Sequence, residues 1–447
     1  MKKRIVLGLV ILALAGCKGN CEISISDNKI TTVKNEQVAA AIDDFSESDK
    51  ADNSEEDIAV PEEHESSRAL SKQEFMDMKF SRACGWDGSI IALTSDGNIV
   101  TWGNNVRGKI GNGERGGYTE DGYSVPVSPF YIDLEDDIVD IETSENDSFA
   151  LTRFGEVYAW GSNSFGELGI NSGFILKPEK LDIDEFVVKV APSNATNLFL
   201  TNDGQVLLSG LDILKYKSLP ERNENIAYEY NPEISEEPSA VTIAEAGYKK
   251  LELPFNCRDI SIGILHYAFL SEDGEVYVEG TLIGDYELSK PDLTHDKLTK
   301  VDFPEKITEI ESGSGFIAAL SETGKVYLYG TRESVFFNEE YDAQLSENFF
   351  LKGGVVGVSS IDCDMYCVVL TNENNDAYGF GIDRWGVFGK ESDSKYEIIS
   401  IPIFLRNNVK DCRTDTLNSI FVSEDGKISM YGANGFKQIS FLNGDFN

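Results

Sequence analysis

Histidine is scarce in this sequence: among 447 residues there are three, His64, His266 and His295. Histidine is the commonest general base and a frequent metal ligand, so few arrangements of a catalytic dyad or a zinc site remain. The G-x-S-x-G nucleophile elbow, the G-K-[ST] phosphate loop and the H-E-x-x-H metal pair are all absent. We therefore predict no catalytic residues, no metal and no cofactor, and we expect that the protein is not an enzyme.

Basic residues are also few. Lys and Arg number 39 against 77 Asp and Glu, which gives a formal net charge of −38 at pH 7. Such a charge repels phosphate backbones, so we predict that nucleic acid is not a partner. The acidic surplus suits solubility, a salty exterior or a cationic partner, and the sequence leaves these three open.

The N-terminal apolar run, Ile5 to Leu14, is too short to cross a bilayer as a helix. A basic Lys2-Lys3-Arg4 segment precedes it, and Leu14-Ala15-Gly16-Cys17 ends it. This ending resembles the lipobox of bacterial lipoproteins. The resemblance implies that residues 1–16 are a cleaved signal peptide and that acylated Cys17 anchors the protein to a lipid bilayer, in a bacterial cell envelope, facing the periplasm or the exterior. The alternative is an ordinary secretory signal with an incidental cysteine.

Residues 17–74 carry no sustained hydrophobic periodicity. Between Asp43 and Glu65 there are eleven acidic residues and one basic residue, Lys50. Like charges repel and little apolar surface is available to bury, so we predict a disordered, extended tether. An acidic ligand for a basic partner is the alternative.

The rest of the chain repeats one hairpin, best seen in Asn146–Gly169. Two apolar runs flank a turn at Gly155, and the second run alternates strictly from Val157, which is the period of a strand. A glycine, Gly161, follows where a neighbouring backbone would approach closely. The hairpin occurs seven times, with turns at residues 97, 155, 204, 274, 324, 375 and 426. In the sixth copy, 368–381, we count one extra residue and find Asn375 in place of the turn glycine. Asn tolerates the positive φ of such a turn better than any other side chain except Gly.

A shorter apolar segment precedes each hairpin, such as Ile138–Ile141 or Ile307–Ile310. Each unit of about 50 residues therefore supplies three or four short strands that are apolar on both faces. Packing seven such sheets radially in a closed ring buries both faces and leaves no open end. We predict an all-β fold, a seven-bladed β-propeller over residues 75–447, with a linear β-solenoid as the alternative.

The motif ALT-x-D-G-x-V-x-x-W-G-x-N-x-x-G-x-L-G resembles the repeat of the regulator of chromosome condensation family. It is clearest in Ile91–Gly111 and Phe149–Gly169. The family's tryptophan matches Trp102 and Trp160, and its histidine matches His266, for which we expect a buried structural role. The family includes exchange factors for small GTPases and a secreted β-lactamase inhibitor. The resemblance thus implies a protein partner, and an exported chain would not meet a cytoplasmic GTPase.

Two features remain as candidate sites. Cys84 and Cys412 fall at similar places in the first and last repeats, so a ring-closing disulfide is one hypothesis and buried free thiols are the other. Residues 211–250 lengthen one interval between repeats and contain Tyr216, Tyr228 and Tyr230. Long insertions in rigid scaffolds are often functional and tyrosines suit interfaces, so we predict partner binding there. A tolerated surface insertion is the alternative.

Together these features predict a monomeric, lipid-anchored lipoprotein whose propeller binds a protein partner, as an adhesin, inhibitor or scaffold. One alternative is an envelope enzyme with its site at the propeller mouth, where convergent Asp, Glu or His with shifted pKa values would be expected. The other is a purely structural envelope protein without a discrete partner.

Overall fold

The computed structural model divides the chain into two compact units, Met1–Glu63 and His64–Asn447. It describes residues 23–26, 29–33, 67–119, 124–134, 136–170, 173–214, 247–283, 292–331, 349–389, 396–415 and 417–444. In the first unit the described residues are two antiparallel strands, β1 (Ile23–Ser26) and β2 (Lys29–Val33). Their β-branched isoleucine, threonine and valine residues favour an extended backbone. Most of the predicted tether lies outside the described residues, so its disorder stays a prediction.

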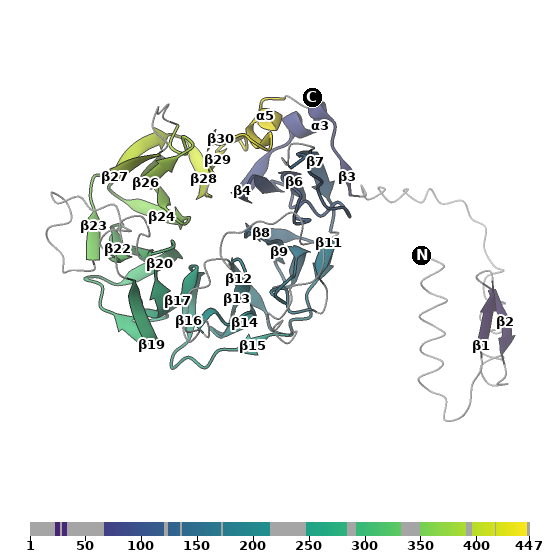
Figure 1. The fold of residues 1–447 in the computed structure, drawn as a ribbon, viewed down its shortest axis with the longest axis horizontal. Coiled ribbons are helices and arrows are strands. Elements are labelled where there is room, and N and C mark those ends of the chain that lie inside the picture. The colour runs from purple at the N-terminus through teal and green to yellow at the C-terminus, as the bar shows by residue number, and fades with distance from the viewer. Residues whose placement is uncertain are drawn as a thin grey trace, which may run out of the picture. The chain divides into compact units, whose positions relative to one another are not determined.

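The second unit is a ring of seven antiparallel sheets, or blades (Figure 1). Blade 1 contains β3 (Arg68–Ala69), β4 (Phe80–Trp86), β5 (Ser89–Thr94), β6 (Ile99–Gly103) and β7 (Val127–Ile132). Blade 2 contains β8 (Ile138–Thr143), β9 (Asp147–Thr152), β10 (Val157–Ser162) and β11 (Phe174–Lys180). Blade 3 contains β12 (Val187–Pro192), β13 (Thr196–Thr201), β14 (Val206–Gly210) and β15 (Lys249–Lys250).

The remaining blades follow in chain order. Blade 4 contains β16 (Cys257–Ile262), β17 (Leu265–Ser271), β18 (Val276–Leu282) and β19 (Leu293–Val301). Blade 5 contains β20 (Ile307–Ser312), β21 (Phe316–Ser321), β22 (Val326–Gly330) and β23 (Phe349–Lys352). Blade 6 contains β24 (Val358–Cys363), β25 (Cys367–Asn372), β26 (Ala377–Arg384) and β27 (Tyr396–Arg406). Blade 7 contains β28 (Val409–Thr414), β29 (Asn418–Ser423) and β30 (Ile428–Gly432). The predicted seven-bladed propeller is confirmed.

The predicted turns have the backbone that their residues permit. The six turn glycines all have positive φ, and Asn375 has φ 60°. The reading of one extra residue in the sixth copy is wrong. Cys367 pairs with Gly381 in blade 6 just as Asp147 pairs with Gly161 in blade 2, so the two hairpins have equal length. Thr371 stands where the other repeats have an aliphatic residue, which hid the register in the sequence.

A hydrogen bond from each of three strands ties a blade to the one before it. The donor lies at the end of the third strand, and the acceptor is a backbone carbonyl in the G-x-L-G loop of the preceding blade or its equivalent. These latches are Trp102 to Gln438, Trp160 to Lys109 and Ser209 to Glu167. Both tryptophans are fully buried. The tryptophan and the glycine loop of the repeat motif therefore form one contact between neighbouring blades.

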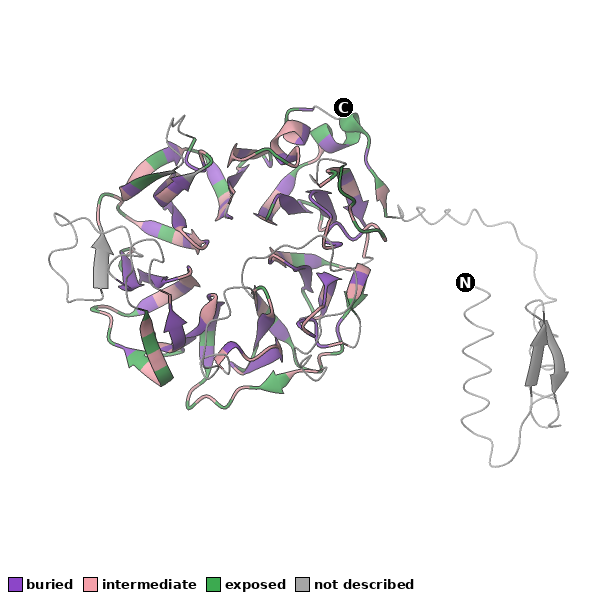
Figure 2. Ribbon diagram, in the orientation of Figure 1, coloured by how far each residue is buried: buried purple, intermediate pink, exposed green. Residues whose placement is uncertain are grey.

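Buried apolar clusters fill the spaces between blades, while exposed residues concentrate on outer strands and loops (Figure 2). His266 is fully buried, as expected of a structural position. Gly161 has φ 121°, and a Cβ there would lie 2.5 Å from the Asn146 carbonyl oxygen, so the predicted close backbone approach is confirmed.

The ring is closed by two short helices rather than by a strand shared between the terminal blades. Helix α3 (Lys72–Asp77) and helix α5 (Gln438–Leu442) place Phe75 and Phe441 in one cluster with Ile420 of blade 7. Strand β3 pairs with β7, and both β3 and α3 begin before residue 75. The propeller unit thus starts earlier in the chain than the sequence predicted, because its first elements are too short to show periodicity.

The predicted Cys84–Cys412 disulfide is wrong, because both cysteines are free and buried. Cys84 packs in the cluster shared with blade 2, whereas Cys412 packs in the cluster shared with blade 6. In the ladder Cys412 is equivalent to Ala83, one residue before Cys84. Successive residues of a strand point to opposite faces, so the two thiols face away from each other.

Candidate functional site in the central channel

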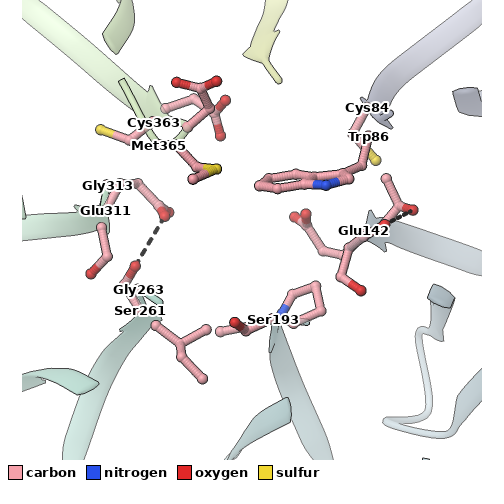
Figure 3. A pocket seen from close by; sticks show the side chains of 18 of the residues that line it. Cys84, Trp86, Glu142, Ser193, Ser261, Gly263, Glu311, Gly313, Cys363 and Met365 are labelled. Carbon is pink, nitrogen blue, oxygen red and sulfur yellow. Dashed lines mark hydrogen bonds between the residues drawn. The ribbon is translucent and has the colours of Figure 1, made fainter. Parts of the chain in front are cut away.

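The inner strands of all seven blades surround one cavity of about 130 Å³ on the propeller axis (Figure 3). Its walls come from the last residues of β4, β8, β12, β16, β20, β24 and β28. Each inner strand has a β-bulge at its second residue. After the bulge, side chains alternate, and every second one meets the channel.

Two layers of mostly polar side chains result. The first layer, immediately after the bulge, is Arg82, Asp140, Lys189, Asp259, Glu309, Ser360 and Asp411. The second layer, two residues further, is Cys84, Glu142, Ala191, Ser261, Glu311, Asp362 and Arg413. Among these residues are seven carboxylates and three cations, so the channel wall is acidic.

Each cation contacts carboxylates from more than one blade. Arg413 lies 3.1 Å from Asp362 and 3.7 Å from Glu142. Lys189 Nζ lies 2.6 Å from Asp259 and 3.2 Å from Glu311. The third cation, Arg82, contacts Asp140 and, at 3.8 Å, Asp411. These ion pairs join the inner strands around the ring.

The channel has more carboxylates than cations, and several of these acids have raised pKa values. Burial, reinforced by Asp140 and Asp362, raises the pKa of Glu142 to about 8 despite the nearby Arg413. Burial and the Glu311 carboxylate raise the pKa of Glu309 to about 7, and burial raises that of Asp362 to about 6. A proton on Glu142 therefore offsets part of the excess negative charge near neutral pH.

One mouth of the channel is more apolar. The Trp86 indole extends into the cavity opposite Met365 (Figure 3). Lys109, which is buried behind this mouth, donates from Nζ to the carbonyl oxygens of Trp86 and Ser144 at 2.9 and 2.7 Å. Burial lowers the pKa of Lys109 to about 8. This lysine holds the inner ends of blades 1 and 2 together.

Convergent carboxylates with raised pKa values are what the enzyme alternative would require. Here most are engaged: Asp362 accepts from Arg413 and from the Thr414 amide, and Glu309 accepts from the Ile361 amide. The lining residues include no histidine, and burial raises the pKa of the lining thiols Cys84 and Cys363. Substrate pockets usually enclose about 300–1,000 Å³. The channel geometry therefore favours a structural role for these acids.

Of the residues predicted as sites, the structure describes Cys84 and Cys412, and it does not bring these two together. Cys17 and the insertion tyrosines Tyr216, Tyr228 and Tyr230 lie outside the described residues, so those predictions stay predictions. In the described part of the chain, no helix is long and apolar enough to cross a membrane, and no group of three His, Cys, Asp or Glu is arranged to hold a metal. Sequence reasoning missed the channel acids, although alternation in Asp140-Ile141-Glu142 was a usable signal.

Comparisons with known proteins agree with the repeat architecture. No model of a known protein family matches the sequence. The serine/threonine-protein kinase Nek9 of Xenopus laevis is 27% identical over 216 residues, covering 46% of this chain and 22% of the kinase. The human regulator of chromosome condensation is 29% identical over 120 residues, covering 26% of this chain and 27% of that protein. The matches thus span about a quarter of these relatives' own length.

Solved structures match over a wider range. Yeast RCC1 (Prp20), solved bound to Kap60, gives a TM-score of 0.57 at 18% identity, covering 89% of this chain and 88% of that chain. The propeller is of the regulator of chromosome condensation type. Human WBSCR16 gives a TM-score of 0.58 at 16% identity, covering 76% of this chain and 89% of that one. At these identities, the structural likeness concerns the RCC1-type fold alone.

Proposed function

We propose that this chain is an exported lipoprotein, anchored through acylated Cys17, whose RCC1-type propeller binds a protein partner. The small, ion-paired channel is the observation that carries the binding role. Because its acids already hold the blades together, the outer surface of the ring is left for recognition. The proposal gives the channel a structural role and no catalytic one.

The family relationship supports binding as the coarse function, since propellers of this type commonly serve as protein-binding scaffolds. Yeast RCC1 was solved in complex with Kap60, and Prp20p was studied for binding to Gsp1p and histones. The lipobox-like Leu14–Cys17 segment supports export, and an exported chain needs an envelope or extracellular partner instead. An adhesin, inhibitor or scaffold role fits these conditions.

Metabolic labelling with a clickable fatty acid tests the anchor in a bacterial host. We expect the full chain to take up label and to fractionate with membranes, and the Cys17→Ser variant to lose both properties. The Cys21→Ser variant is the matched control, because it removes a thiol four residues away and should keep the label. Labelling that persists in Cys17→Ser, or that is absent from the wild type, would refute acylation at Cys17.

Crosslinking from intact cells tests the partner. The full chain and a variant with Tyr216, Tyr228 and Tyr230 all replaced by Ser are captured after mild crosslinking. One recurrent partner that the triple variant loses would locate binding on the 211–250 insertion. The same partner retained by both chains would place binding elsewhere on the propeller. Capture of no recurrent partner by the wild type would sink the binding role.

A further inference from the structure

Four apolar side chains are exposed close together where blades 2 and 3 meet. Phe154 is 63% exposed, Val139 49%, and Phe186 and Val188 42% each. We call Val139, Phe154, Phe186 and Val188 the aromatic patch. Exposed apolar side chains scattered singly need no explanation, but a contiguous group of them marks an interaction site.

The other repeats show that Phe154 is not required by the fold. It precedes the turn glycine of the hairpin, and the equivalent residues of the other six blades are all small and polar. They are Asp96, Asp203, Asp273, Thr323, Asn374 and Asp425. A type of residue that favours turns is therefore replaced in blade 2 alone by an exposed aromatic ring.

Phe186 is exceptional in the same way. Its carbonyl oxygen accepts from Asn202 in the hairpin turn of its own blade, and this bond recurs in every blade. The equivalent acceptors are Lys79, Asp137, Asn256, Lys306, Gly357 and Asn408. No other repeat has an aromatic or aliphatic side chain at this position.

Val139 and Val188 occupy the bulged position of their inner strands. The equivalent residues in the other five blades are polar: Ser81, Arg258, Thr308, Ser359 and Lys410. Bulges re-aim side chains, and here they turn two valines toward solvent. These three repeat positions are polar in the rest of the ring, apart from Gly357, and apolar side chains occupy them only in the adjacent blades 2 and 3.

Backbone contacts bring the segments that carry the patch together at the boundary between the blades. The Phe186 ring lies on the turn of blade 2, since a Cβ on Gly155 would be 2.6 Å from its Cδ1 atom. The Val187 amide donates to the Gly155 carbonyl at 3.1 Å, which brings Phe186 beside Phe154. The Arg153 amide donates to the Asp137 carbonyl, which brings the same turn beside the start of β8.

Carboxylates surround the patch. Asp137 lies before β8, and Asp184 and Glu185 lie immediately before Phe186, all of them exposed. Residues 136–139, 153–155 and 184–188 contain one basic residue, Arg153. Its side chain is already paired with Asp137 at 3.1 Å. A symmetric contact with a second copy would bring this acidic rim against itself. The complementary occupant is an apolar anchor flanked by basic side chains.

We propose that the aromatic patch binds a protein segment in which apolar anchor residues are flanked by Lys or Arg. This inference rests on the proposed binding function and names the partner's chemistry. Phe154 and Phe186 fill the centre of the contact and exclude water, while the acidic rim selects basic flanks and excludes acidic ones.

Peptide probes test the inference with the full chain. The first probe has a Phe-Leu-Leu-Phe centre flanked by lysines, the second replaces the lysines with glutamates, and the third replaces the centre with serines. We expect the first probe to bind about tenfold or more tightly than either twin, with an affinity that falls as salt rises. Equal binding of the serine probe would overturn the role of the patch, and equal binding of the glutamate probe would overturn that of the rim.

The repeats themselves supply the variants. Phe154→Asp and Phe186→Asn install residues that other blades carry at the same positions, so the fold should tolerate both. The double variant should lose about tenfold or more in affinity for the first probe. Trp385→Asn is the matched control, because Trp385 is 67% exposed on blade 6 at φ 62°, where Asn is well tolerated. Unchanged affinity in the double variant would overturn the inference.

Capture of the cellular partner by the wild type and by the double variant distinguishes a failure of this inference from a failure of the proposed function. A partner captured by the wild type and lost with the double variant supports both. A partner captured equally by both chains refutes the patch and leaves the binding function intact. If the double substitution weakens only binding to anionic vesicles or self-association in sedimentation, and no captured protein or peptide probe is affected, the patch does not bind a protein segment and the inference is refuted.

Discussion

Arg413 donates to Asp362 across the boundary between blades 7 and 6, with Nη1 and Oδ1 3.1 Å apart. The same guanidinium reaches Glu142, an inner-strand residue of blade 2, on the far side of blade 1. Its side chain is 18% exposed. One cation thus joins three inner strands of the ring and neutralises part of a crowded group of carboxylates.

Replacing Arg413 should therefore be costly. In Arg413→Met the Asp362 carboxylate stays buried without its cation, and we expect a loss of about 3–5 kcal/mol in the free energy of unfolding. Urea unfolding followed by tryptophan fluorescence measures it. The control is Arg153→Met, which breaks an exposed pair with Asp137 and should change stability by no more than about 1 kcal/mol. Equal effects of the two substitutions would contradict the bracing role.

The channel acids should make stability depend on pH. Glu142 has its pKa raised from 4.5 to about 8, so between these values the folded protein holds a proton that the unfolded chain has released. Its contribution is fully present below about pH 4.5 and is lost as pH rises through 8, at up to about 1.4 kcal/mol per pH unit. Glu309 and Asp362 act in the same direction.

The Glu142→Gln variant isolates this effect, because glutamine resembles the protonated acid. We expect its unfolding free energy to fall less steeply than that of the wild type between pH 5 and pH 8. Glu322→Gln removes an exposed carboxylate and should keep the slope of the wild type. A slope that is identical in all three chains would mean that Glu142 is ionised throughout this range.

Gly161 should tolerate no side chain. In Gly161→Ala the new Cβ would lie 2.5 Å from the Asn146 carbonyl oxygen and 2.8 Å from the Asp147 Cα atom, at φ 121°. Backbone atoms cannot move aside, so we expect a loss of about 3 kcal/mol or more, read from the thermal midpoint. Gly173→Ala is the control, since no heavy atom lies within 4 Å of its Cβ, and its midpoint should barely move.

Cys84 and Cys412 should remain separate thiols in the folded protein. Both are buried, and burial raises the pKa of each thiol well above its ordinary value. A thiol reagent should therefore modify neither residue until the chain unfolds. Peptide mapping without reductant checks the pairing, and a fragment that joins the two residues would contradict the arrangement of the blades.

Local rules sufficed for the repeat architecture. The Asp-Gly turn and the alternating strand are encoded within about a dozen residues, so all seven hairpins could be read without knowing their neighbours. Asn375 has φ 60°, so the residue type alone was enough to predict a turn where the glycine is missing. Ring closure involved no such local signal, because Leu70 and Phe441 are brought together only by the complete propeller.

The directions in which the channel acids and the two thiols face could not be predicted, because they depend on a strand register that the sequence does not reveal. A bulge in every inner strand moves the following side chains by one position, which decides whether Glu142 faces the channel and whether Cys412 faces blade 6. Spacing alone made Cys84 and Cys412 look equivalent. The aromatic patch was visible in the repeats, since Phe154 stands where the other blades have polar turn residues, but the neighbouring Phe186 required the structure.

The latch from Trp102 to the Gln438 carbonyl oxygen repeats, between blades 7 and 1, the contact that Trp160 makes within the ring. Its two partners are separated by most of the chain, and the cluster of Phe75 with Phe441 shares this property. A polypeptide that is still being synthesised therefore cannot close its ring. The face of blade 1 that packs against blade 7 stays uncovered until the last segment has been made, and chaperones would have to protect it during that interval.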